Sequence, residues 1–409
     1  MEQHLAPALI VRNFCRALAV ACACAGACAG IARADDCTDC GPVQLAGKYT
    51  QEYWHLASGG AVPGSAAIAK GDVSIDVDGG RALHLPGVQL FGRVIFDSNG
   101  SISVDHVGDA QGISSIEAYS AYHVYEAWAE RGIAGGHGSV RLGLYDLNSE
   151  FDSIPTAGLF ANPSHGIGRD FSQSGRAGPS IFPLTSLALR VAARMDEQWG
   201  FRFAVLDAVP GNPDRPKANT IHLDGTEGAL MVAEMDYAGG RLGKLGIGTW
   251  YYTARFADLV PAQPATQGDQ RGALGAYAFA DVQLGQWEGS RPRSLSAFLR
   301  YGVADPRVHR FGSYLGSGIV LTGALREDDQ LGLAMARAIN GHDYRTSLES
   351  QDMPSNAAET NIELTWRVPL RKWLAIQPDV QYVFNPTTDP TLKDALVVGI
   401  RVELSGGFP

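Results

Sequence analysis

Hydrophobic and polar residues alternate along most of the chain, which is the pattern of β-strands with one apolar and one polar face. In the stretch that begins at Trp199, this residue and Phe203 fall on one face, and Arg202 falls on the other. The same period of two returns along 358–368 and again along 393–404. The pattern predicts an all-β protein.

The length of the alternating segments favours a membrane barrel over a soluble β-sandwich, although both architectures alternate. Most segments run for 10 to 13 residues, which suits tilted strands of about 9 to 11 residues that cross a bilayer. Strands of soluble proteins are usually about five or six residues long. The faces opposite the apolar ones carry Arg, Glu, Gln and Gly, as a water-filled lumen requires. We therefore expect a transmembrane antiparallel up-and-down β-barrel.

The number of candidate strands is even, as single-chain bacterial barrels require. The first, second, tenth and twelfth segments have the weakest pattern, so counts of fourteen or eighteen stay open. A barrel of about 16 strands leaves an aqueous channel rather than a packed interior. The sixteen expected strands are 48–56, 68–78, 87–97, 115–129, 137–147, 184–195, 199–208, 227–238, 242–257, 271–285, 293–303, 315–325, 330–340, 358–368, 372–384 and 393–404.

Short and long connections alternate along the chain. Links such as Asp196 to Trp199 suit periplasmic turns, and longer polar links such as 341–357 suit the external side. The connection 148–183, with 36 residues, is far longer than ordinary loops, and such loops are usually functional. We expect it to fold into the lumen and to form a constriction.

The chain begins like an exported protein. Residues 1–34 combine Arg12 and Arg16 with a short apolar stretch and the ending Ala32-Arg33-Ala34, which predicts a cleaved signal peptide rather than a retained anchor. Residues 35–47 are then an N-terminal arm, and 48–409 form the barrel. The arm holds Cys37 and Cys40, which suit a local disulfide better than a zinc or redox site, because no second half-site follows.

Charge and hydropathy exclude two classes of protein. After removal of the signal, 30 basic and 42 acidic residues leave a net charge near −12, which repels nucleic acid. No run of 18 apolar residues follows the signal, so a helical membrane protein is excluded.

Three blocks of the long connection carry a family resemblance. They are YDLNSEFD at 145–152, GLFANPSHGIG at 158–168 and FSQSGRAGPSIFP at 171–183. At these residues the chain closely resembles the carbohydrate-selective porins, OprB type, of Gram-negative outer membranes. The resemblance implies a sixteen-stranded barrel in the outer membrane that admits glucose and other small sugars by diffusion. It also implies outer-membrane lipid and the barrel-assembly machinery as partners, with monomer and trimer both open. The chain departs from the usual aromatic C-terminus, because Ser-Gly-Gly-Phe-Pro follows Leu404.

A sugar-selective pore needs planar hydrogen-bonding groups and aromatic surfaces that bind weakly enough to release the solute. Most charged wall residues could simply form a solvated lining, and a subset could meet the long loop in a narrow eyelet. Our candidates for stacking on sugar rings are Phe151, Phe160 and Phe171. Our polar candidates for lining the pore are Arg93, Glu117, Arg141, Asn148, Glu150, Asp152, Arg169, Asp170, Arg190, Arg202, Glu234, Arg367 and Asp379.

The sequence carries no sign of a cofactor, a metal site or an enzyme. His123, His165 and His222 lack metal-ligand spacing, and no GxSxG elbow or P-loop occurs. Three alternatives stay open: a porin of broader or organic-acid selectivity, a barrel enzyme with a triad built between strands, and an adhesive or structural barrel.

Overall fold

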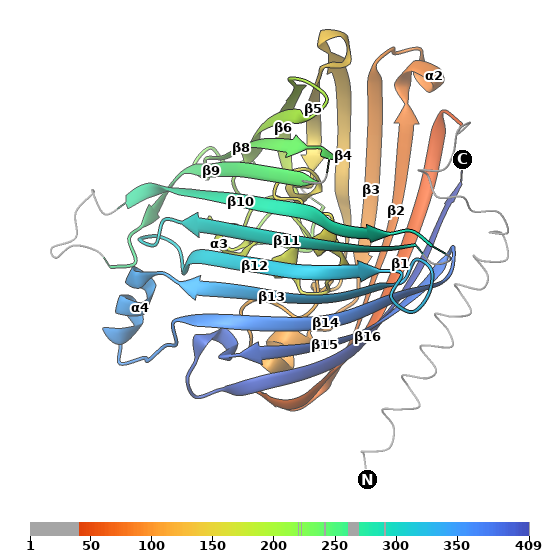
Figure 1. The fold of residues 1–409 in the computed structure, drawn as a ribbon. Coiled ribbons are helices and arrows are strands. Elements are labelled where there is room, and N and C mark those ends of the chain that lie inside the picture. Colours follow the sequence, from red (N-terminus) through yellow and green to blue (C-terminus); the bar gives the residue numbers. More distant parts are fainter. Residues whose placement is uncertain are drawn as a thin grey trace.

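A computed structural model describes residues 41–219, 221, 223–240, 243–260, 270–289 and 292–408. The expected signal peptide and the arm cysteines Cys37 and Cys40 lie outside these residues. Each strand pairs antiparallel with its neighbours in sequence, and β1 pairs with β16, which closes the barrel (Figure 1). The expected barrel of sixteen strands is confirmed.

The strands are longer than the sequence suggested at several ends. The first begins five residues before the expected position, inside the predicted arm, and extends beyond Leu56. The strands are β1 Val43–Gly60, β2 Ser65–Asp78, β3 Val88–Asp97, β4 Ala121–Ile133, β5 Gly138–Tyr145, β6 Ser186–Arg194, β7 Trp199–Asp207, β8 Ala229–Ala238, β9 Lys244–Ala257, β10 Gln270–Trp287, β11 Arg293–Ala304, β12 Phe311–Thr322, β13 Gln330–Asn340, β14 Ala358–Arg371, β15 Leu374–Phe384 and β16 Lys393–Phe408.

Helical elements are short and lie in the connections. None of the helices among the described residues has the length and apolar character needed to cross a membrane. They are α2 Gly79–Leu83, η2 Ser103–Val107, η3 Ala134–Gly136, η4 Leu147–Ser149, η5 Thr156–Leu159, η6 Pro163–His165, α3 Arg169–Ser172, α4 His342–Glu349 and η9 Pro386–Thr388.

One prediction at the start of β4 is wrong. Residues 115–120 were expected to belong to a strand, but β4 begins at Ala121. The preceding residues instead leave the wall and fold inward, where Ile102, Val107 and Ile113 are fully buried. We call residues 98–120 the second inward segment.

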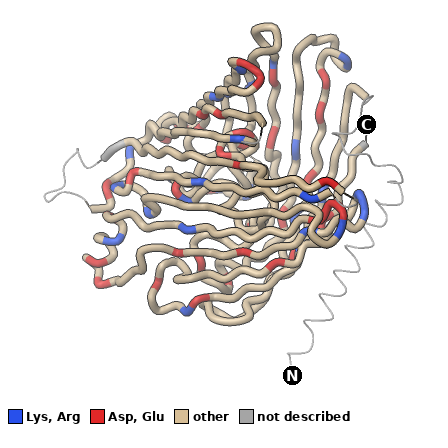
Figure 2. Tube along the Cα trace, viewed as in Figure 1, with Lys and Arg blue, Asp and Glu red and all other residues tan. Residues whose placement is uncertain are grey.

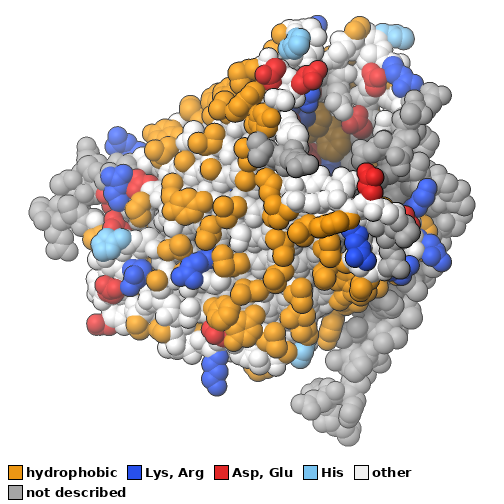
Figure 3. All heavy atoms as spheres, in the orientation of Figure 1, with side chains coloured by type: hydrophobic (Ala, Val, Ile, Leu, Met, Phe, Trp, Pro, Cys, Tyr) orange, Lys and Arg blue, Asp and Glu red, His pale blue; other side chains and the backbone are white. Residues whose placement is uncertain are grey.

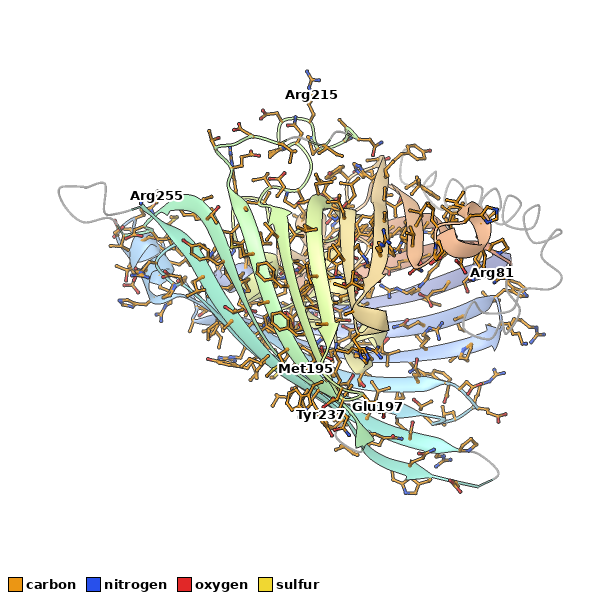
Figure 4. The ribbon with its side chains drawn as sticks, turned by 90° about the horizontal axis from the view of Figure 1, so that it is seen from above. Arg81, Met195, Glu197, Arg215, Tyr237 and Arg255 are labelled. Atoms are coloured by element: carbon orange, nitrogen blue, oxygen red, sulfur yellow. The ribbon has the colours of Figure 1, made fainter. Side chains whose placement is uncertain are left out.

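The two ends of the barrel differ, as expected. Short links such as 134–137 and 372–373 lie at one end, and the longest connections lie at the other, together with the four-residue link 61–64. Figure 4 shows Glu197, in one short link, at the opposite end from Arg215 and Arg255. In an outer-membrane barrel, the short turns face the periplasm.

The outer wall is apolar. Ile247, Leu299, Leu333 and Ile400 are 42–58% exposed on the strands, and hydrophobic side chains dominate the face seen in Figure 3. Charged residues nevertheless occur along the strands of this same wall (Figure 2). The charges therefore point mainly into the lumen, and the apolar side chains face outward, as lipid requires.

The hydrophobic core lies inside the barrel. The connection between β5 and β6, residues 146–185, enters the lumen, and we call it the constriction loop. Its Phe151 and Phe171 pack with Trp250 and Tyr277 of the wall in one buried cluster, and α3 lies behind β11 in Figure 1. The expected inward-folded loop is confirmed.

Candidate functional site

The constriction loop is anchored to β11 by a buried ion pair. Arg300 donates from Nη2 to Asp152 at 2.7 Å and also pairs with Asp170. All three side chains are at most 3% exposed. Tyr277 and Tyr314 flank the guanidinium, with ring centroids 5.4 and 5.2 Å from its central carbon. A buried charge needs such partners, so Asp152 and Asp170 serve to fix the loop.

Wall side chains also hold the backbone of the loop. Glu363 on β14 accepts the N–H groups of Ala161 and Asn162 at 2.6 and 3.0 Å. Glu234 on β8 accepts the N–H of Asp152 at 2.7 Å. Thr156 donates its N–H to Asp281 on β10 at 2.9 Å. Carboxylates on three strands therefore satisfy backbone donors that would otherwise be buried without partners.

The three rings expected to stack on sugars are packed instead against the wall. Phe151, Phe160 and Phe171 are 0–4% exposed. Phe171 stacks on Trp250, with centroids 5.1 Å apart and planes 5° apart. Their apolar surface stabilises the docked loop, so these rings present no free face to a solute in this structure.

The second inward segment supports the constriction loop from the side of β13–β16. Glu359 on β14 accepts the N–H groups of Ala110 and Gln111 at 2.8 and 2.9 Å. Ser115 donates its N–H to the carbonyl of Ala161 at 2.7 Å, which ties the two segments together. Sequence reasoning missed this brace. The only available signal was the Gly, Ser and Asp content of 98–115, which argues against a strand.

Glu117 belongs to this segment rather than to a strand face. Its carboxylate accepts from the hydroxyls of Ser101 and Ser103 at 2.6 and 3.0 Å. Burial raises the pKa of Glu117 to about 7, and the two serine hydrogen bonds oppose this shift.

Two further loop candidates serve the internal structure of the loop. Asn148 donates from Nδ2 to the carbonyls of Phe151 and Gly166 at 3.1 and 2.9 Å. Arg169 is partly buried, and its nearest hydrogen-bond partner among the described residues is Ser172, at 3.4 Å. These contacts make the two side chains part of the scaffold of the loop.

One group of candidates meets where the loop joins β4–β6. Arg190 donates from Nε to Glu150 of the loop at 2.8 Å and from Nη2 to Glu130 of β4 at 2.6 Å. Arg141 of β5 donates from Nε to Glu130 at 2.7 Å. We call these four residues the arginine–glutamate cluster. Glu150, Glu130 and Arg141 keep 24%, 19% and 12% of their side chains exposed, and Arg190 keeps 2%.

Arg93 extends this polar surface onto β3. Its Nε donates to Asp72 of β2 at 2.7 Å, and its Nη1 lies 3.7 Å from Glu126 of β4. The side chain is 28% exposed. Guanidinium and carboxylate groups therefore run side by side across β2–β6.

Of the remaining candidates, Arg202 adjoins the cluster, because it interacts with the charge of Glu150, and Arg367 and Asp379 lie on β14 and β15. Arg202 binds Glu234 at 2.7 Å. Glu234 also accepts the N–H of Asp152, so it belongs to the wall residues that hold the constriction loop. Arg367 binds Glu403 at 3.0 Å near the short-turn end, and Asp379 is 3% exposed. The sequence did not single out Arg300 or Glu130, because nothing local distinguishes them from other charged residues of the wall.

The part of the chain that the structure describes contains no group of three or more His, Cys, Asp and Glu side chains that could hold a metal ion. His165 lies between Phe160 and Phe298, with ring centroids 5.0 and 5.8 Å away, and neither ring nitrogen has a hydrogen-bond partner. Burial lowers the pKa of His165 to about 3, so this ring is neutral when the loop is docked.

Comparisons with known proteins agree with this architecture. Residues 73–405 match the model of the family described as carbohydrate-selective porin, OprB family. Porin B of Pseudomonas aeruginosa is 27% identical over 354 residues, which cover 76% of each chain. The high-pH structure of Pseudomonas putida OprB has a TM-score of 0.80 and 20% identity, and the match covers 89% of this chain and 94% of that one. The low-pH structure of the same protein has a TM-score of 0.57 at 16% identity.

Proposed function

The chain belongs to the carbohydrate-selective porins of the OprB family, and on that basis we propose that glucose-sized sugars diffuse passively past the arginine–glutamate cluster. The observation that carries the proposal is the contact of Glu150 with Arg190, which joins the constriction loop to the wall. The family and the barrel describe a channel in the Gram-negative outer membrane rather than an enzyme.

The chemistry of the cluster suits a neutral, hydroxyl-rich solute. Arginine offers several donors in a fixed plane, and the carboxylates of Glu130 and Glu150 offer acceptors. Arg141 and Arg190 already pair with these carboxylates, so a sugar exchanges hydrogen bonds and gains little net binding. Weak binding of this kind lets a solute enter and leave again.

A porin that favours organic acids is the second candidate function. Lys48 and Arg367 face the lumen near the short-turn end, with 45% and 34% of their side chains exposed. Exposed cations attract anions into a water-filled tube. The formal charge of the chain is −10, however, and both side chains share Glu403 as a partner, which favours neutral solutes.

Liposome swelling with glucose, maltose and gluconate tests the proposal. We expect glucose to enter faster than maltose or gluconate. Glu150→Gln keeps the size of the side chain and removes the charge that Arg190 binds, so the preference for glucose should weaken. Glu197→Gln, in the exposed 195–198 turn, is the matched control and should behave as the wild type. Faster entry of gluconate into wild-type vesicles would support the organic-acid function instead.

The remaining partners are proposals as well. Outer-membrane lipid covers the apolar wall, and the barrel-assembly machinery inserts the chain. Detergent extraction followed by light scattering distinguishes a monomer from a trimer.

A further inference from the structure

Two neighbouring aromatic rings on the inner wall, Phe91 and Trp128, are only partly buried. Phe91 on β3 lies directly opposite Trp128 on β4, and both alternate with Arg93 and Glu130 on the lumen face. Their centroids lie 5.0 Å apart with planes 23° apart. Both side chains are only partly buried, and neither belongs to the packed clusters that bury Phe151.

The pair adjoins the arginine–glutamate cluster. The central guanidinium carbon of Arg141 lies 3.7 Å from the ring centroid of Trp128, and Trp128 donates from Nε1 to Glu126 at 3.2 Å. Trp128 therefore lies between Phe91 and Arg141 in a row of stacked flat groups, and Phe91 ends the row. On β3, Phe91 lies closer to the short-turn end than Arg93, so the row begins on the periplasmic side of the charged surface.

The backbone makes room for this arrangement. Gly143 of β5 is the partner of Trp128 in the ladder and has a φ of +145°, which L side chains rarely adopt. A Cβ there would lie 2.5 Å from the Cα of Trp128. A residue other than glycine at this position would displace Trp128.

Partly exposed aromatic surface in a water-filled lumen is unfavourable unless a solute or a side chain covers it. Phe151 and Phe171, in contrast, are fully buried in the cluster that docks the constriction loop. We propose that Phe91, through the ring face turned away from Trp128, forms a stacking subsite for the ring face of a pyranose, on the periplasmic side of the cluster. The proposal rests on the proposed function.

Polar groups flank the two rings on both sides. Gln89 donates from Nε2 to Asp76 at 2.8 Å on one side, and Glu130 with Arg141 lies on the other. A sugar whose C–H face lies on the Phe91 ring can direct its equatorial hydroxyls to these groups. Stacking of this kind is weak enough for transit.

Single-channel recording with glucose and sorbitol tests the subsite. The two solutes have similar size and hydroxyl content, but sorbitol is an open chain without a ring face. Added from the short-turn side, glucose should block the wild-type current about three to ten times longer than sorbitol. Phe91→Leu should remove this difference in blocking time at nearly unchanged ion conductance. Phe91→Tyr, which keeps an aromatic ring, should retain the difference.

Phe96→Leu is the control, because Phe96 lies on the same strand and faces outward, 39% exposed. A wild type that does not distinguish glucose from sorbitol overturns the subsite, as does a difference that persists in Phe91→Leu. A wild type that admits gluconate faster than glucose in the swelling assay overturns the proposed function separately.

Discussion

Arg300 on β11 binds two aspartates that lie 18 positions apart in one loop: its Nη2 is 2.7 Å from Asp152, and its Nη1 contacts Asp170. The side chain thus closes a ring that contains η5, η6 and the start of α3. One wall cation therefore holds two distant points of the constriction loop.

Arg300→Met should release the loop. The substitution leaves two buried carboxylates without their cation, and breaking such a pair costs about 3–5 kcal/mol. We expect higher mean conductance, more current noise and loss of sugar preference. A variant that also carries Asp152→Asn and Asp170→Asn removes the uncompensated charges and should recover part of the wild-type behaviour. Wild-type conductance in the single variant would show that the backbone contacts alone hold the loop.

Deletion of most of residues 153–180 should widen the channel. The deletion removes η5, η6 and α3 but leaves the strands β5 and β6 intact. Conductance should rise, and the discrimination among sugars of similar size should disappear, because a wide tube selects by size alone. Heat-modifiable migration on a gel verifies that the barrel is folded. Unchanged selectivity in a folded deletion variant would place the selective element outside the loop.

Acid should loosen the constriction loop through His165. The neutral ring is favoured in the docked loop, because its pKa is about 3 there and about 6.5 in an exposed histidine. The free energy of loop docking is therefore unaffected by His165 above pH 6.5. It becomes less favourable as the pH falls towards 3, by about 2 kcal/mol at pH 5.

His165→Phe removes the titrating group and keeps an aromatic ring. Hydrogen exchange of the loop amides, corrected for intrinsic rates, should increase from pH 7 to pH 5 in the wild type and less in this variant. Burial raises the pKa of Asp170, which shifts stability in the opposite direction, so the difference between the two proteins isolates His165. Equal acid sensitivity in both would contradict the assignment.

Alkali should loosen the second inward segment through Glu117. Its pKa rises to about 7 in the folded protein, so the protonated form is favoured there. The stability it contributes is complete below about pH 4.5 and is lost as the pH rises through 7. Exchange of the amides around Ser103 should accelerate from pH 5 to pH 8. Glu117→Gln, which stays neutral and keeps an acceptor, should remove that pH dependence, and a dependence that persists in this variant would contradict the assignment to Glu117.

The barrel could be predicted because the alternation that specifies each strand depends only on residues that are neighbours in the sequence. Alternation around Phe203 or Ile400 requires only that neighbouring residues face opposite sides, and the structure confirms the outward position of Ile400. The docking of the loop depends on residues far apart in sequence. Asp152 carries no local sign that it pairs with Arg300, and Phe171 has no sign that Trp250 covers it.

Dependence on contacts between distant residues also explains why the sequence did not single out Phe91 and Trp128. In the sequence, Phe91 and Trp128 look like ordinary members of alternating strands, and Phe151 lies in the conspicuous loop. Only the tertiary structure distinguishes rings that are covered from rings that are not. Residue type and position in the family's most distinctive segment were therefore poor guides to exposure.

The contacts of Glu363 and Glu234 with loop amides have a consequence for how this channel can diversify. A carboxylate that binds main-chain N–H groups accepts the same bond from any residue except proline at that position. Residues such as Ser149 or Pro155, which are exposed on the loop, can thus be exchanged while the loop keeps its place. These backbone contacts do not involve the exposed side chains of the loop, so libraries at exposed loop positions should retain folded barrels.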